Sequence, residues 1–198
     1  MNWKAQTLQY YDQAPDAFVS NTLSADMSDT QSRFLSCLPD NALILDFGCG
    51  SGRDAKAFLE AGYRVEATDG SEELCVRASE YTGINVKKML FNELDAYDMY
   101  DGIWACASIL HLPKAELADV LRRIEAALKP GGVLYTSFKY GDFEGVRKGR
   151  YLKDFTEETL KVLWSQETSM KIFDQWITQD VRPGREEERW INILTRKG

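Results

Sequence analysis

The sequence has a single histidine, His111, and only four cysteines among its 198 residues. Cys37, Cys49, Cys75 and Cys106 are widely spaced, and no two of them form a C-x-x-C pair. A zinc site needs about four such ligands at closer spacing, so we expect no metal site here. We expect instead buried free thiols, which behave as small hydrophobic side chains in a reducing compartment.

Long apolar runs are also absent. No run approaches the roughly 20 residues that a membrane-spanning helix requires, and no basic segment followed by an apolar stretch stands near Met1. We therefore expect a cytoplasmic protein with neither a signal peptide nor a membrane partner. The sequence leaves the oligomeric state open.

Positive charge is the scarcer sign, with 24 lysines and arginines against 31 acidic residues and a net charge of −7. An acidic surface repels phosphate backbones, so no nucleic-acid partner is expected unless a local basic patch overcomes the average field. The one basic cluster consists of Lys139, Arg147, Lys148, Arg150 and Lys153.

Apolar runs alternate with amphipathic segments along most of the chain. Strands are predicted at 42–46, 63–68, 86–90, 100–107, 133–138, 171–181 and 188–196. Helices are predicted at 3–12, 28–37, 54–61, 72–81, 114–128 and from 156 onward, with a turn at 129–132, a loop at 139–153 and a hairpin-like connection at 182–185. This order predicts an α/β, Rossmann-like, doubly wound sheet of seven mostly parallel strands, with an antiparallel last strand and helices on both faces.

The length fits one domain, 1–198, with three expected parts. Residues 1–41 form an N-terminal helical lid, 42–138 a cofactor-binding core, and 139–198 an acceptor-side flap, helix and closing hairpin. Ligands of such sheets bind at the carboxyl ends of the strands.

A glycine-rich loop, Asp46-Phe47-Gly48-Cys49-Gly50-Ser51-Gly52, joins the first predicted strand of the core to a helix. Its glycines let the backbone approach a ligand closely. Asp69 ends the next predicted strand, 21 positions beyond Gly48, where a carboxylate can accept both hydroxyls of a ribose. The pattern predicts a cofactor that contains adenosine.

The loop favours S-adenosylmethionine over a dinucleotide. Dinucleotide loops usually read G-x-G-x-x-G, whereas the third glycine here, Gly52, comes one place early. Asp46 would repel a pyrophosphate, but it would attract a cationic amino group or sulfonium.

These segments together resemble the class I S-adenosylmethionine-dependent methyltransferases, specifically the small-molecule type that includes the tellurite-resistance methyltransferases. The resemblance rests on Asp46–Gly52, Asp69-Gly70-Ser71, Ala107–Leu112 and Leu128–Gly132. It is much more specific for the cofactor than for the methyl acceptor.

The resemblance implies a set of cofactor-binding residues, namely Tyr11, Asp46, Gly48, Cys49, Gly50, Asp69, Gly70, Ser71, Leu90, Phe91, Ala107 and Ser108. Asp46 would reach the methionine amino group, and Asp69 would hold the ribose hydroxyls. The family often has an aspartate beside the adenine where this chain has Phe91-Asn92, so that Asn92 or a backbone carbonyl would replace that contact. Tyr11 would close over the methionine part, unless its helix simply packs its aromatic side chains on the sheet.

Methyl transfer mainly requires positioning of the acceptor and exclusion of water. His111 stands where a catalytic base could reach the acceptor, although it could equally cap the following helix or pack against Pro113. The acceptor-side candidates are Tyr140, Arg147, Arg150 and Tyr151, in a segment that is either a mobile flap for an anionic or planar acceptor or a solvated surface loop.

Other activities fit the residue types less well. The turn after the fourth core strand lacks the Pro-Pro-aromatic sequence of base amino-methyltransferases, and no Pro-Cys nucleophile occurs. Asp101 and Asp142 are too isolated to suggest a metal-dependent catechol-type site. A protein or RNA methyltransferase, a non-catalytic cofactor-binding protein and an NAD-dependent oxidoreductase remain as alternatives to a small-molecule methyltransferase.

Overall fold

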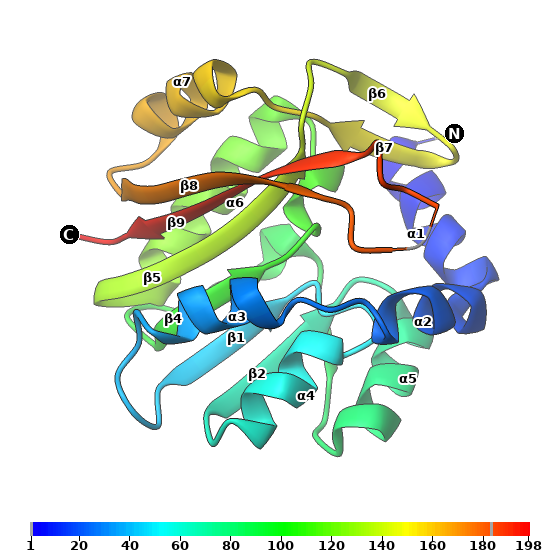
Figure 1. Cartoon of the computed structure of the whole chain (residues 1–198), viewed down its shortest axis with the longest axis horizontal. Helices are drawn as coiled ribbons and strands as arrows, with labels where there is room; N and C mark the ends of the chain where they lie inside the picture. Colours follow the sequence, from blue (N-terminus) through cyan, green and yellow to red (C-terminus); the bar gives the residue numbers. More distant parts are fainter. Residues whose placement is uncertain (1, 183) are drawn as a thin grey trace.

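The computed structural model describes residues 2–182 and 184–198, and it contains a sheet of seven strands (Figure 1). Across the sheet the order is β3 (Lys87–Lys88), β2 (Arg64–Asp69), β1 (Leu43–Phe47), β4 (Tyr100–Ala105), β5 (Leu128–Lys139), β9 (Arg189–Arg196) and β8 (Lys171–Gln179). β1 to β5 pair in parallel, and β9 is antiparallel to both of its neighbours. The predicted fold class is therefore confirmed, including the antiparallel last strand.

Helices cover both faces of the sheet (Figure 1). On one face lie α6 (Lys114–Ala127) and α7 (Glu157–Glu167), and on the other α3 (Ser28–Leu35), α4 (Arg53–Glu60) and α5 (Glu72–Thr82). The predicted apolar stripe of α6 is fully buried, with Leu117, Leu121 and Ile124 facing the sheet. On the opposite face Trp104 of β4 stacks on Tyr135 of β5, with 3.9 Å between ring centroids.

Two local predictions were wrong, and one helix was not predicted. β3 has only two residues, both exposed, instead of the predicted 86–90. The predicted turn at 129–132 belongs to β5, which starts at Leu128 and accommodates Gly131 in a left-handed conformation (φ 79°) beside an irregularity in its pairing with β4. The structure also contains a helix that was not predicted, α2 (Pro15–Leu23), which begins at Pro15 because proline is well tolerated in the first helical turn.

The predicted loop at 139–153 is also wrong, since it contains a hairpin of β6 (Glu144–Arg147) and β7 (Arg150–Lys153). β7 lies against α1 (Trp3–Gln13). Both lie at the carboxyl edge of the parallel strands, on the right of Figure 1. The predicted connection at 182–185 is part of the segment 180–188 between β8 and β9, in which Pro183 lies outside the described residues.

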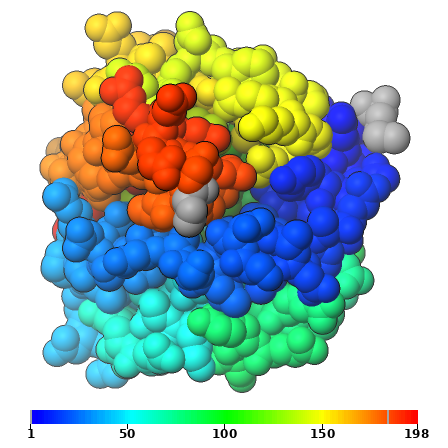
Figure 2. Space-filling view, turned by 45° about the vertical axis from the view of Figure 1, so that its right-hand side comes forward, coloured from blue at the N-terminus to red at the C-terminus, as the bar shows by residue number. Residues whose placement is uncertain are grey.

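β8 runs in the same direction as β5, because both are antiparallel to β9. The chain therefore leaves β8 at the carboxyl edge of the parallel strands. Figure 2 looks toward this edge, where the dark blue N-terminal helices, the yellow hairpin and the red segment after β8 gather. None of the helices in the described ranges combines the length and apolar character that crossing a membrane requires.

Candidate active site

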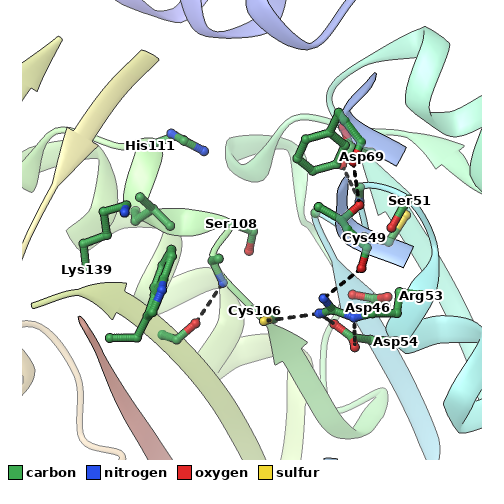
Figure 3. A pocket seen from close by; sticks show the side chains of 18 of the residues that line it. Asp46, Cys49, Ser51, Arg53, Asp54, Asp69, Cys106, Ser108, His111 and Lys139 are labelled. Carbon is green, nitrogen blue, oxygen red and sulfur yellow. Dashed lines mark hydrogen bonds and ion pairs between the residues drawn. The ribbon is translucent and has the colours of Figure 1, made fainter. Parts of the chain in front are cut away.

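A cavity of about 640 Å³ opens at the carboxyl edge of the sheet. It is lined by the loop after β1, the ends of β2 and β4, α1, β7 and the connection between β8 and β9. All the predicted cofactor-binding residues line it except Ser71. Figure 3 shows two ends, with Asp46, Cys49 and Asp69 on one side, His111 and Lys139 on the other, and Ser108 between them.

The glycines of the loop after β1 leave room that no other residue would leave. Gly48 and Gly50 adopt left-handed conformations, with φ of 81° and 56°. A Cβ on Gly48 would lie 2.6 Å from the Cβ of Ser108, and one on Gly50 would lie 3.0 Å from the Phe18 ring. The loop therefore needs glycine both for its backbone conformation and for its close neighbours.

Asp69 ends β2 and organises the same loop. Its Oδ2 accepts a hydrogen bond from the amide of Gly50, and its Oδ1 accepts one from the amide of Ser71, both at 2.9 Å. Burial raises the pKa of Asp69 despite these bonds. Ser71 itself is structural, because its hydroxyl caps α5 and donates to Asp12.

Asp46 is a buried carboxylate at the methionine end of the predicted cofactor site. Oδ2 accepts a hydrogen bond from the amide of Ala55 at 3.0 Å, in the first turn of α4. Burial, with the nearby Asp54 carboxylate, raises the pKa of Asp46 well above its usual range. A cationic group beside Asp46 would stabilise its ionised form.

Arg53, which was not predicted as a site residue, lies next to this carboxylate pair. Arg53 binds both oxygens of Asp54, which also accepts hydrogen bonds from Gln31 and from the Trp104 indole. Arg53 begins α4 and carried no recognisable signal in the sequence. The network fixes α3, α4 and β4 relative to one another around the glycine loop.

The backbone after β4 turns sharply under the cavity. Ala107 has a left-handed conformation (φ 49°), and its amide donates to the Ser137 hydroxyl at 2.9 Å. Ser108 donates to the carbonyl of Phe47 at 2.7 Å. Such a conformation costs an alanine roughly 1–3 kcal/mol and is typical of functional turns.

Leu90 and Phe91, which the resemblance places beside the adenine, line the cavity. The Phe91 ring packs edge-on against Phe47, with 4.9 Å between centroids. The side-chain oxygen of Asn92 accepts a hydrogen bond from Lys4 at 3.3 Å, so that this amide is already engaged with α1.

His111 lies at the other end of the cavity and uses both ring nitrogens. Nδ1 lies 2.7 Å from the carbonyl oxygen of Tyr151, which can only accept, so Nδ1 carries the proton. Nε2 is then an acceptor and receives the Tyr11 hydroxyl at 2.8 Å. Burial lowers the pKa of His111 to about 4, so the ring is neutral near neutral pH.

Of the four predicted acceptor-side residues, only Arg150 lines the cavity. The Tyr140 hydroxyl donates to Glu157, Arg147 pairs with Asp154, and the Tyr151 hydroxyl donates to Glu144. These three side chains hold the hairpin and its surroundings together. The tyrosine ring of Tyr151 also packs on Trp3 of α1.

A further wall of the cavity is formed by Lys139, from the predicted acceptor-side segment, and by Asp180, Arg182 and Trp190, which were not predicted. A signal existed, because an antiparallel last strand forces the preceding connection to lie at the carboxyl edge. Arg182 pairs with Asp180, and Lys139 pairs with Glu188. No group of three or more potential metal ligands occurs among residues 2–182 and 184–198.

The residues of the first end fit S-adenosylmethionine. The left-handed glycines form a cradle that a Cβ would fill, and Asp46 offers a buried carboxylate where a cationic amino group is predicted. Asp69 points its carboxylate at the same loop from the neighbouring strand.

Known proteins agree with this assignment. Residues 44–132 match the protein family described as "Methyltransferase domain". N-terminal Xaa-Pro-Lys N-methyltransferase 1 of Homo sapiens is 35% identical over 98 residues, which are 46% of this chain and 44% of that protein. The chain spans about half the length of the curated relatives it matches.

Solved methyltransferase structures share the fold over nearly the whole chain. The 1,6-didemethyltoxoflavin-N1-methyltransferase of Burkholderia thailandensis, solved with 1,6-didemethyltoxoflavin and S-adenosylhomocysteine, has a TM-score of 0.78 at 24% identity, covering 98% of this chain and 88% of its own. The N-methyltransferase NodS of Bradyrhizobium japonicum, solved with S-adenosylhomocysteine, has a TM-score of 0.70 at 15% identity, covering 94% and 97%. Residues 44–132 thus match a methyltransferase domain, as predicted. The solved structures show that the chain has the fold of methyltransferases that were crystallised with S-adenosylhomocysteine.

Proposed function

We propose that this chain, which contains an S-adenosylmethionine-dependent methyltransferase domain, methylates a small molecule bound in the cavity between the glycine loop and His111. The observation that carries the proposal is the single cavity of about 640 Å³ that joins these two ends. When bound, the cofactor supplies a methyl carbon activated by a positive sulfonium.

The residues of the first end hold the cofactor in this proposal. Asp46 binds its amino group, Asp69 its ribose hydroxyls, and Leu90 and Phe91 border its adenine. Gly48 and Gly50 let the backbone approach it closely. Tyr11 closes the site from α1, whose Thr7 hydroxyl accepts the amide of Tyr151 at 3.0 Å and so joins α1 to β7.

The second end holds the acceptor and receives its proton. The neutral His111 ring can take a proton at Nε2, because Nδ1–H is already fixed on the carbonyl of Tyr151. The Tyr11 hydroxyl bonds to Nε2 of His111. The acceptor either passes its proton to Nε2 through this hydroxyl or displaces the hydroxyl and bonds to Nε2 directly.

The cover over the cavity favours a small acceptor. α1, the β6–β7 hairpin and the segment after β8 surround the opening, whereas a protein substrate needs an accessible groove (Figure 2). The tellurite-resistance type of enzyme and the Burkholderia enzyme, whose printed ligand is a small heterocycle, are consistent with this choice.

A protein N-terminus is the second candidate acceptor, because the human relative is a peptide N-methyltransferase by name. Lysine in an Xaa-Pro-Lys terminus is cationic, and the second end of this cavity carries Arg150, which no carboxylate balances in the part of the chain that the structure describes. Like charges disfavour such a peptide there, so we rank it below a small molecule.

The test is transfer of label from methyl-labelled S-adenosylmethionine to either class of acceptor. The purified protein is incubated separately with a filtered metabolite extract and with a synthetic peptide beginning Ser-Pro-Lys. We expect label in a small-molecule product and none in the peptide. Label in the peptide alone would reverse the ranking, and failure to bind S-adenosylhomocysteine in calorimetry would contradict the proposed function as a whole.

A further inference from the structure

The cations that line the cavity differ in how their charge is balanced. Arg53 pairs with Asp54, Lys139 with Glu188 and Arg182 with Asp180. Arg185 lies near Glu188 as well. Within the part of the chain that the structure describes, Arg150 is the one cavity-lining arginine without a carboxylate partner.

The guanidinium of Arg150 is nevertheless held in a defined place. It lies over the Tyr10 ring at 4.5 Å from the centroid, and at 5.8 Å from that of Tyr11. Nη1 donates to the Tyr11 hydroxyl at 3.2 Å. The stacked aromatic rings and this bond restrain the side chain without neutralising it.

Several donors of this group remain unused. Nε of Arg150 is buried and has no hydrogen-bond partner among residues 2–182 and 184–198. A guanidinium has five N–H donors arranged as a planar fork, which matches the two oxygens of a carboxylate. Leaving a buried donor unpaired is costly, so the arrangement favours a ligand that accepts from it.

Two of the carboxylates that line the cavity, Asp69 and Asp180, already have partners. Asp69 accepts two backbone amides in the glycine loop. Asp180 binds Arg182 and the Trp190 indole. Either carboxylate would give up its own buried hydrogen bonds in order to reach Arg150.

We propose that Arg150 is a specificity residue that binds a carboxylate of the methyl acceptor, next to the His111 end of the cavity. This inference rests on the proposed function, because it identifies the chemical class of that acceptor. Arg150 contacts the same Tyr11 hydroxyl that bonds to Nε2 of His111, so an acid bound by Arg150 has its nucleophile beside that nitrogen.

The charge of the acceptor also bears on His111. The positive Arg150 is one of the groups that lower the pKa of His111, after burial. A carboxylate on Arg150 offsets that charge and makes it easier for Nε2 to receive a proton. Arg150 thereby couples recognition of the acceptor's carboxylate to removal of the proton from the acceptor's nucleophile.

The probes are aromatic and heteroaromatic carboxylic acids, each paired with its neutral amide, beginning with anthranilate and anthranilamide. Binding is measured by calorimetry and by ligand-observed NMR, with and without S-adenosylhomocysteine. The members of each pair have nearly the same shape and differ in charge. We expect the acids to bind at least about tenfold more tightly than the amides, as a charge-assisted bidentate pair predicts.

The matched variants are Arg150→Gln, which removes the fork, and Lys148→Gln, an exposed residue of the same hairpin outside the cavity. Arg150→Gln should erase the preference for acids, and Lys148→Gln should keep it. Thermal unfolding and S-adenosylhomocysteine affinity establish that each variant is folded.

Three results would overturn the inference: equal binding of acids and amides, binding of neither, or an acid preference that persists in Arg150→Gln. These results are distinct from failure of the proposed function, which is loss of S-adenosylhomocysteine binding in the wild-type protein. Acid and amide binding can also be compared without S-adenosylhomocysteine, so that the inference is tested whether or not the protein binds the cofactor product.

Discussion

The Tyr11 hydroxyl, on the N-terminal helix, lies 2.8 Å from Nε2 of His111, a hundred residues further along the chain. Because Nδ1 of His111 donates to the Tyr151 carbonyl, the hydroxyl must donate to Nε2, and it accepts in turn from Arg150. One hydroxyl thus joins α1, the turn after β4 and the β6–β7 hairpin at the acceptor end of the cavity.

Tyr11→Phe should impair methyl transfer with little change in cofactor affinity. The substitution leaves Nε2 of His111 without its donor and removes an acceptor from Arg150, at a cost of about 1–3 kcal/mol in stability. We expect turnover to fall at least about tenfold, as for loss of a positioned proton-transfer group. Turnover and S-adenosylhomocysteine affinity are measured together.

Tyr10→Phe is the matched control for this change. Tyr10 lies beside Tyr11, and its ring also packs under Arg150, but its side chain is 39% exposed and makes no hydrogen bond in the described structure. Removing its hydroxyl should leave turnover unchanged. Equal losses in both variants would show that the aromatic packing, and not the Tyr11 hydroxyl, matters.

The stability of the protein should depend on His111 in a defined pH window. Its folded pKa of about 4 lies below the ordinary value of 6.5, so the unfolded chain binds more protons between these values. The stability contributed by the neutral ring is therefore fully present above pH 6.5 and is lost as the pH falls toward 4. The shift corresponds to about 3 kcal/mol.

His111→Asn isolates this effect from the many carboxylates that titrate in the same range. Urea unfolding is measured for both proteins from about pH 7 to about pH 4. The wild-type protein should lose about 3 kcal/mol more stability than the variant over that range. Parallel pH profiles would contradict the assignment of a buried neutral ring.

Asp69→Ala should weaken S-adenosylhomocysteine binding by about tenfold to a hundredfold, because ribose hydroxyls donate to a charged acceptor in our proposal. Asp69 also holds the amides of Gly50 and Ser71, so Asp69→Asn, which keeps the shape, is measured beside it by calorimetry. Asp142→Asn, at an exposed position outside the cavity, is the control. Unchanged affinity in both Asp69 variants would remove Asp69 from the cofactor site.

The residues predicted for the cofactor end lie together in the structure because the signals that marked them are local. Asp46–Gly52 and Asp69 each follow a strand whose apolar pattern is evident, and parallel strands bring their carboxyl ends to one edge. The acceptor end depends on contacts between distant segments. Nothing in the pattern around Tyr140 or Arg147 distinguishes them from Arg150, since the difference lies in which carboxylate each one meets after folding.

The hairpin and α2 escaped prediction for a similar reason. The segment around β6 and β7 has short, charged strands that pair only with each other and lie against α1. Its two strands, Glu144–Arg147 and Arg150–Lys153, contain few apolar residues and therefore lack the alternation that marks a strand. The short helix α2 begins at Pro15, a residue that is tolerated only in the first turn of a helix.

Gly48→Ala should destabilise the protein and abolish cofactor binding, because two costs coincide at this position. The left-handed backbone costs an alanine about 1 kcal/mol, and the new Cβ would lie 2.6 Å from the Ser108 Cβ and 3.1 Å from the Phe91 ring.

Gly62→Ala separates the two costs. Gly62 has nearly the same backbone conformation, with φ of 89°, but nothing lies within 4 Å of its added Cβ. Gly62→Ala should lose only about 1 kcal/mol and bind S-adenosylhomocysteine normally. Gly48→Ala should lose about 1–3 kcal/mol more in urea unfolding, because the overpacked turn after β4 must move. Equal stability of the two variants would mean that the space between Gly48 and Ser108 can accommodate a methyl group. The close fit that we assign to the cofactor loop would then be wrong.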